Sequence, residues 1–144
     1  MLPEYELVGV YSRTVAKAER IAGRMAEAGK SCAVCTTADE LLALKPDILV
    51  ETASPAALRE FAVPALKNGT SIVTLSIGAL ADDAFYREVC ETAKENGTRI
   101  YIASGATGGF DVLRTAALMG KATARFYNEK GPDALKGTPV YEEA

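Results

Sequence analysis

The sequence has 144 residues, of which 49% are hydrophobic and 24% are charged, a balance typical of one soluble globular domain. Its formal net charge of −3, with basic residues scattered along the chain, argues against a nucleic-acid or lipid-headgroup surface and favours small-molecule partners. No apolar run reaches the roughly 18 residues that span a membrane, and the N-terminus lacks a signal-peptide layout, so we expect a cytoplasmic protein.

Histidine is absent from the sequence, and the three cysteines stand at irregular spacing. Without histidine, the chain itself has no Ser-His or Cys-His catalytic pair and no histidine metal ligand. Cys32 and Cys35 form a CxxC pair, but we expect them on a short strand, where residues three apart point to opposite faces. We therefore interpret these cysteines as packing residues and predict neither a metal site nor a catalytic residue within the chain.

Strand-like and helical patterns alternate from the start of the chain. An apolar, β-branched run over residues 5–11 predicts a strand, and a helical spacing of apolar residues follows from Val15. Residues 31–35 predict a second, short strand. Thr37 is placed to cap a brief helix, which must stop before Pro46.

The same alternation continues in the second half of the chain. Residues 48–50 are continuously apolar, which predicts a strand that is buried on both faces. Pro55 suits the first turn of the helix that follows. The other predicted strands cover residues 72–75 and 99–103, and the other predicted helices begin at Asp82 and at about Phe110, the last one ending near Met119.

Strands that alternate with helices over this length predict an α/β fold, a Rossmann-like parallel sheet with helices on both faces. The sequence contains no GxGxxG turn, so we interpret the fold as incomplete, with the first βα unit absent. In the usual strand order the absent strand would lie between the strands predicted at residues 5–11 and 48–50. Those two strands then either pair directly, accept a strand from another chain, or leave edges exposed to aggregation, and we favour the first two outcomes.

Small, hydroxyl-bearing or glycine residues follow four of the predicted strands. Ligands of a parallel sheet bind beyond the carboxyl ends of its strands, so these positions are candidates for ligand contact. Turn formation alone explains any single loop equally well, but four such loops together favour a ligand site. The candidates are Ser12, Arg13 and Thr14 after the first strand, Ser54 and Pro55 after the third, Ser76, Gly78 and Ala79 after the fourth, and residues 104–109 after the fifth.

Ser12 and Arg13 carry the most specific of these predictions. An NAD-specific site usually ends this strand with an acidic residue that binds the ribose 2′-hydroxyl, whereas serine and arginine favour the 2′-phosphate of NADP. The alternative is a solvated arginine at the start of a helix. Glu51, at the end of the third strand, either orients a ligand or pairs with a neighbouring group, and the sequence leaves both roles open.

Three stretches of the chain together resemble the L-aspartate dehydrogenase family. They are ETASP at residues 51–55, SIGA at residues 76–79 with Asp82 shortly after it, and SGATGGFD at residues 104–111. The last stretch is similar to SGAxGGxD in that family, in which the residue matching Ala106 contacts the nicotinamide cofactor. The resemblance implies that the candidates after the first strand face the adenosine ribose and that those after later strands, with Ala106, line the nicotinamide side.

The resemblance also implies how the chain is organised. Residues 1–120 would form a partial NAD(P)-binding domain, and residues 121–144 the start of the substrate domain or a C-terminal tail. In the family, a strand with a GxGxxG-type turn precedes the position of Met1, and the catalytic histidine follows the last residue of this chain. We therefore expect a fragment that is inactive alone and has no catalytic residue of its own.

For the complete protein, the resemblance implies an oxidoreductase that uses NADP or NAD and acts on the CH–NH2 group of L-aspartate to give iminoaspartate. Its partners would be the dinucleotide and a small amino-acid substrate, in a homo-oligomer, with neither nucleic acid nor membrane. Two alternatives stay open. One is a related dehydrogenase with a homoserine-like or sugar-like substrate, and the other is a catalytically silent binding or oligomerisation module.

Overall fold

The computed structural model describes residues 4–103 and 110–121, together with the single residues 123, 125, 127, 129 and 131. The chain divides into two compact units, Met1–Gly105 and Ala106–Ala144. Helix α5 (Phe110–Met119) belongs to the second unit and confirms the helix predicted there. The candidate Ala106 lies outside the described residues. The remaining elements all belong to the first unit.

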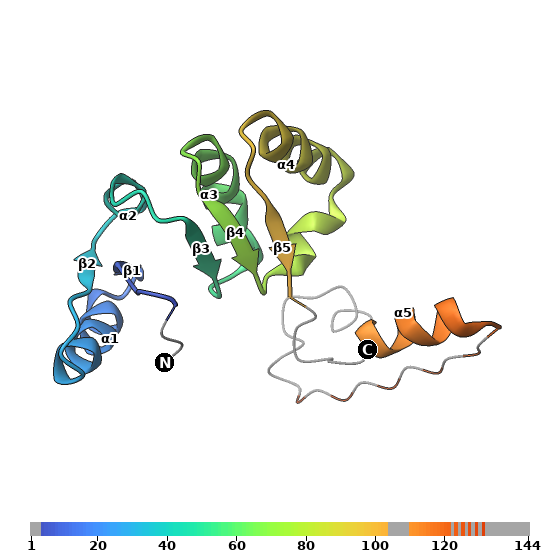
Figure 1. Cartoon of the computed structure of the whole chain (residues 1–144), viewed down its shortest axis with the longest axis horizontal. Coiled ribbons are helices and arrows are strands. Elements are labelled where there is room, and N and C mark those ends of the chain that lie inside the picture. The colour runs from blue at the N-terminus through green and yellow to red at the C-terminus, as the bar shows by residue number, and fades with distance from the viewer. Residues whose placement is uncertain are drawn as a thin grey trace. The chain divides into compact units, whose positions relative to one another are not determined.

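Two parallel sheets form the first unit, as Figure 1 shows. Strands β1 (Gly9–Tyr11) and β2 (Ala33–Cys35) make one sheet. Strands β3 (Ile48–Glu51), β4 (Ser71–Thr74) and β5 (Ile100–Ile102) make the other, in the order β3-β4-β5. The α/β class and the parallel pairing are therefore confirmed. Of the two outcomes favoured for β1 and β3, direct pairing does not occur in this structure, because the two strands lie in different sheets.

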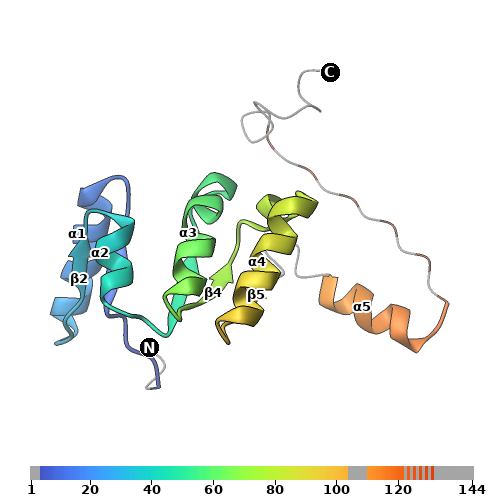
Figure 2. The ribbon, with the colours of Figure 1, turned by 90° about the horizontal axis from the view of Figure 1, so that it is seen from above.

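Helices connect the strands in the predicted places. Figure 2 shows the same ribbon turned by 90°, with the four longer connections labelled. They are α1 (Val15–Glu27), α2 (Ala38–Ala43), α3 (Pro55–Lys67) and α4 (Asp83–Glu95), and a 3-10 turn, η1 (Ile77–Ala81), precedes α4.

Side-chain caps fix the starts of two helices where the sequence predicts them. The Thr37 hydroxyl accepts a hydrogen bond of 3.1 Å from the backbone N–H of Glu40 and begins α2. The Asp82 carboxylate accepts bonds of 3.0 and 3.1 Å from the backbone N–H groups of Ala84 and Phe85 and begins α4. Each cap satisfies a donor that the helix itself leaves unpaired, which is why these residue types mark helix starts.

The first strand is shorter than predicted. The sequence indicates a strand over residues 5–11, but β1 contains only Gly9–Tyr11, and the apolar Tyr5, Leu7 and Val8 are 57%, 40% and 40% exposed. A strand requires a hydrogen-bonding neighbour, and β2 provides three residues, paired from Ala33 to Cys35. The apolar pattern is present before Gly9, but the described pairing with β2 starts at Gly9, after a bond of 3.0 Å from the N–H of Ala33 to the carbonyl of Val8.

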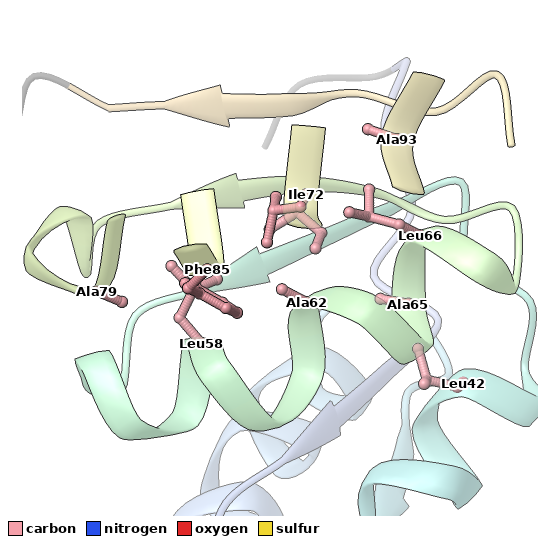
Figure 3. Close-up of a cluster of buried hydrophobic side chains, with 10 residues drawn as sticks. Leu42, Leu58, Ala62, Ala65, Leu66, Ile72, Ala79, Phe85 and Ala93 are labelled. Carbon is pink, nitrogen blue, oxygen red and sulfur yellow. The ribbon is translucent and has the colours of Figure 1, made fainter. Parts of the chain in front are cut away.

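Helices α3 and α4 build the main core on one face of the three-stranded sheet. Leu58 and Leu66 of α3, Ile72 of β4 and Val89 of α4 are each 0% exposed. Figure 3 shows Leu58 beside Phe85, and Leu66 and Ala62 directed toward Ile72. Burial of several large aliphatic side chains in one cluster stabilises this part of the unit.

Contacts with α3 connect the β1–β2 part of the unit to this core. The rings of Tyr11 and Phe61 lie 5.6 Å apart between centroids, in a tilted arrangement. The Asn68 side chain donates to the carbonyl of Leu42 at 2.9 Å, so the end of α3 is bonded to α2. These contacts link the two sheets through side chains.

The opposite face of the three-stranded sheet carries exposed apolar residues. Parallel pairing places Leu49 beside Ile72 on the face that α3 and α4 cover. Since side chains alternate along a strand, the neighbours Ile48 and Val50 lie on the other face, where they are 40% and 60% exposed. A continuously apolar strand is typical of a sheet covered on both sides, and in the described structure only one side of β3 is covered.

We expect this exposed face to make the 144-residue chain self-associate. Replacing both Ile48 and Val50 with threonine should lower the fraction of associated protein in sedimentation velocity runs, because threonine keeps a high β propensity and removes apolar surface. Val34→Thr in β2 is the matched control, since its side chain is 36% exposed in the other sheet. Equal association of the double variant and the control would contradict the prediction.

Candidate functional site

The carboxyl ends of β3, β4 and β5 lie at one level of the sheet. Glu51 pairs with Thr74, and Thr74 with Ile102, so each of these residues ends its strand beside the next. The loops after β3 and β4 consequently start side by side. A Cβ atom placed on Gly78 would lie 3.9 Å from Cγ of Pro55, which shows that the two loops come within van der Waals distance.

A buried carboxylate, that of Glu51, binds both of these loops. The side chain is 5% exposed. In the loop after β3, the backbone N–H groups of Ala53 and Ser54 donate to its Oε1 at 2.7 and 3.0 Å. From β4 and its loop, the Thr74 hydroxyl donates to Oε2 at 2.7 Å and the Ser76 hydroxyl donates to Oε1 at 3.0 Å.

All four donors that contact Glu51 in the described part of the chain are neutral. Burial raises the pKa of this carboxyl, but the hydrogen bonds from Thr74, Ala53, Ser76 and Ser54 outweigh the burial and lower the pKa below its ordinary value. An anion that accepts four hydrogen bonds is a poor proton acceptor. Of the two roles that the sequence left open, the structure shows Glu51 paired with neighbouring groups.

Ser54 and Pro55 begin helix α3. The Ser54 hydroxyl accepts a 3.1 Å bond from the N–H of Ala57, and Pro55 occupies the first turn. Ser54 is half-buried and Pro55 is exposed. Both candidates therefore have a structural role as helix start, and their backbone lies where the helix N-terminus favours negative charge.

Ser76, Gly78 and Ala79 form the turn after β4. The backbone N–H of Ser76 donates to the Thr74 hydroxyl at 3.0 Å, in addition to the bond from its own hydroxyl to Glu51. Gly78 is exposed, whereas the side chain of Ala79 is buried, at 1% exposure. Among the described candidates, Gly78 is thus the one without a side chain between its backbone and a ligand.

Arg59 holds the far end of this turn, a role that sequence reasoning missed. Its Nη2 donates to the carbonyl of Ala79 at 3.2 Å and lies 3.4 Å from a carboxylate oxygen of Asp82. The guanidinium also stacks over the ring of Phe85, 4.8 Å from the centroid. An arginine on a helix surface gives no sequence signal for such a contact, because the partners lie about twenty residues further on.

Ser12, Arg13 and Thr14 lie apart from these loops in the topology. They follow β1, in the two-stranded sheet, and precede α1. The Ser12 hydroxyl accepts a 3.3 Å bond from the N–H of Thr14, and Thr14 begins α1 without a side-chain cap. Arg13 is exposed. The structure therefore brings together the candidates after β3 and β4, and it describes no contact between them and residues 12–14.

A hollow of about 340 Å³ lies between β1, α2 and α3, and the lining includes Tyr11, Thr36 and Phe61. None of the predicted cofactor-binding residues lines it. Among the described residues, no group of three or more histidine, cysteine or acidic side chains is arranged to hold a metal ion. The described helices include none with the length and apolar character needed to cross a membrane.

Parallel strands joined by helices, with serine- and glycine-containing loops at the carboxyl edge, are typical of dinucleotide-binding domains. Residues 3–103 match the model of the family described as homoserine dehydrogenase, NAD binding domain. The chain belongs to this family of NAD-binding domains.

Relatives named L-aspartate dehydrogenase confirm the resemblance seen in the sequence. The protein from Psychrobacter cryohalolentis is 31% identical over 138 residues, which are 96% of this chain and 51% of that protein. L-aspartate dehydrogenase 1 from Bordetella pertussis is 42% identical over 98 residues, which are 68% of this chain and 38% of that protein. The chain thus spans about half the length of these relatives, or less.

One solved structure supports the fold. Aspartate dehydrogenase from Thermotoga maritima aligns with 78% of this chain and 51% of its own chain, with a TM-score of 0.51 and 24% sequence identity. A likeness at this identity supports the Rossmann-like arrangement of strands and helices and carries no information on substrate.

Proposed function

We propose that this chain is the dinucleotide-binding part of an oxidoreductase that acts on the CH–NH2 group of L-aspartate with NADP or NAD. The observation that carries the proposal is the match of 96% of the chain to a relative named L-aspartate dehydrogenase. A bound nicotinamide dinucleotide would accept a hydride from the substrate Cα while the amino group loses a proton, giving iminoaspartate, NAD(P)H and a proton.

The residues present fit such a cofactor. Gly78 leaves open space beside the loop after β4, because a Cβ atom there would meet only Pro55 within 4 Å. We assign Ser54, Pro55, Ser76, Gly78 and Ala79 to the nicotinamide side, together with Ala106 by resemblance. Ser12, Arg13 and Thr14 are assigned to the adenosine ribose. The chain would bind and orient the cofactor, and we assign no catalytic residue to it.

Several broader features of the complete protein belong to the same proposal. Residues 1–120 would form the dinucleotide-binding domain and residues 121–144 the start of the substrate domain or a tail. The relatives' greater length supports a further domain for the substrate. We further propose a cytoplasmic homo-oligomer, which the acidic composition and the exposed apolar face of β3 support.

Substrate assays on the protein encoded by the complete reading frame test the proposal. L-aspartate should support formation of NADPH or NADH, whereas L-homoserine and free sugars should not. Homoserine is the control substrate because the matching family model is described by homoserine dehydrogenase. Activity with homoserine alone would overturn the proposed substrate, and binding of a dinucleotide without activity toward any of these substrates would favour a silent binding module.

Replacement of Gly78 by alanine should weaken dinucleotide binding by about tenfold, because the new methyl group takes up space that the cofactor approaches. The fold should tolerate this change, since the 3.9 Å distance from the new Cβ to Pro55 is an ordinary contact. Gly23→Ala in α1 is the matched control, because nothing lies within 4 Å of a Cβ there. Calorimetric titration that gives equal affinities for the two variants would contradict the assignment of Gly78.

A further inference from the structure

We infer that Glu51 is a positioning residue that holds the loops after β3 and β4 in one fixed arrangement for the dinucleotide. The cofactor part of this inference rests on the proposed function. The geometric part rests on the described residues alone. Glu51 lies at the end of β3, beside Thr74 at the end of β4, and both side chains are buried.

The Glu51 carboxylate is bonded to both loops through separate groups. Its Oε1 accepts three hydrogen bonds, from the N–H groups of Ala53 and Ser54 on one side and from the Ser76 hydroxyl on the other. Its Oε2 accepts the Thr74 hydroxyl, whose oxygen in turn accepts the N–H of Ser76. Oε1 thus bonds to both loops directly, whereas Oε2 reaches the loop after β4 through Thr74.

The same contacts show that Glu51 acts through other groups. The side chain is 5% exposed, and both oxygens are occupied by donors of the chain itself. Ser54 begins α3, and Ser76 begins the turn that contains Gly78. The position of Glu51 thus sets the backbone of the residues that we assign to the nicotinamide side.

Arg59 holds the far end of the turn after β4, whereas Glu51 holds its start. Arg59 bonds the carbonyl of Ala79 and the side chain of Asp82, so the far end of the turn is fixed independently of Glu51. Without the Glu51 carboxylate, the turn would keep its attachment at Ala79 and lose the bond from the Ser76 hydroxyl. Because the Cβ position of Gly78 lies 3.9 Å from Pro55, any movement of the turn that this loss permits changes the spacing of the two loops directly.

Two threonines of the same segment provide a matched pair of variants. Thr74→Val removes the hydroxyl that donates to Glu51 at 2.7 Å, at the carboxyl edge. Thr70→Val removes a hydroxyl that donates to the Pro46 carbonyl at 2.8 Å, at the amino edge. Both threonines are 0% exposed, and they flank the two ends of β4. Thr70→Val loses one side-chain hydrogen bond, whereas Thr74→Val loses the bond to Glu51 and also the bond from the N–H of Ser76. Glu51→Ala is the stronger version of the first change.

Amide hydrogen exchange on the complete protein without ligand is the first measurement. Glu51→Ala should increase exchange in both loops, residues 52–57 and 75–78, because it removes the carboxylate that joins them. Thr74→Val leaves the three bonds to Oε1 in place and should increase exchange in residues 75–78, where the N–H of Ser76 loses its acceptor. Thr70→Val should leave both segments as in the wild type. Exchange that rises in only one loop of Glu51→Ala, or equally in Thr70→Val, would overturn the inference.

Titration with NADP and NAD is the second measurement. Thr74→Val and Glu51→Ala should raise the dissociation constant of the preferred dinucleotide roughly tenfold or more, because the site loses its preformed arrangement, and Thr70→Val should not. Equal dissociation constants in all variants would overturn the role of Glu51 while leaving the proposed function intact. Absence of dinucleotide binding in the wild type would instead overturn the proposed function, and the exchange measurement would still decide whether Glu51 couples the loops.

Discussion

Replacement of Arg13 by alanine is expected to shift cofactor preference from NADP toward NAD by roughly 10- to 100-fold in the ratio of kcat/KM values. Arg13 is exposed directly after β1, next to the start of α1, where a ribose 2′-phosphate would meet its guanidinium. A hydrogen bond to a charged group contributes about 1.5–3 kcal/mol, and about 1.4 kcal/mol corresponds to tenfold. The loss should fall on NADP, because NAD has no 2′-phosphate.

Arg24 provides the control for this change. It is an exposed arginine in the last turn of α1, so Arg24→Ala removes the same charge from the same helix at the end remote from Ser12 and Thr14. Kinetics with both cofactors, on the complete protein, should show the shift in Arg13→Ala only. An unchanged ratio in Arg13→Ala would assign this side chain to the solvated helix start that the sequence allowed.

Local sequence signals predicted the elements and several of their ends. Thr37 and Asp82 cap helices where their residue type and position indicated, because a cap depends on groups within three residues of it. Pro55 stands in the first turn of α3 for the same local reason. The serine- and glycine-containing loops at strand ends also follow from local order, once the strands are known to be parallel.

The contacts that organise the candidate site depend on register between strands, which the sequence does not display. Glu51 and Thr74 meet because β3 and β4 pair in a particular register, and a shift of one residue would turn these side chains to opposite faces. Arg59 meets Ala79 because α3 and η1 pack together. Glu51, at the end of a continuously apolar run, was the sequence signal for a polar contact here, but the sequence did not name its partners.

The length of β1 could not be predicted for a different reason. The apolar run over residues 5–11 is a valid strand pattern, but in the described structure β1 pairs with β2 only from Gly9, and the bond from the N–H of Ala33 to the carbonyl of Val8 precedes that pairing. Pattern indicates which face a residue prefers, and pairing decides whether the strand forms. The exposure of Ile48 and Val50 has a similar cause. Their apolar pattern is typical of a face that another element covers, and no described element covers that face of β3.

Replacement of Glu51 by glutamine should destabilise the protein at neutral pH by about 1–3 kcal/mol, because the donors around this side chain lose a charged acceptor. Burial raises the pKa of the Glu51 carboxyl, and the bonds from Thr74, Ala53, Ser76 and Ser54 outweigh it, so the pKa in the folded protein lies below the ordinary value of 4.5. The folded state consequently binds this proton more weakly than the unfolded state does.

The sign of the pH dependence follows because the pKa of Glu51 is lower in the folded state than in the unfolded state. The carboxylate of Glu51 stabilises the fold fully above the unfolded pKa, and this stabilisation disappears as the pH falls through the lowered folded pKa. Urea unfolding between pH 3 and pH 7 should therefore show a difference between wild type and Glu51→Gln that is largest at pH 7 and shrinks below about pH 4. A constant difference at every pH would contradict the ionised state of Glu51.

Other acidic groups do not confuse this measurement. The pKa values of Glu40 and Asp82 are also lowered, mainly by backbone N–H groups of Thr36 and Phe85, but these groups are the same in wild type and variant and cancel in the difference. Glu88→Gln, at an exposed position of α4, is the control and should change stability by less than about 0.5 kcal/mol.

A glutamine at position 51 can still accept through its oxygen and donate through its amide to Thr74, whose hydroxyl can rotate. The variant should thus keep the two loops together while losing the pH dependence, which separates the charge of Glu51 from the arrangement that it holds.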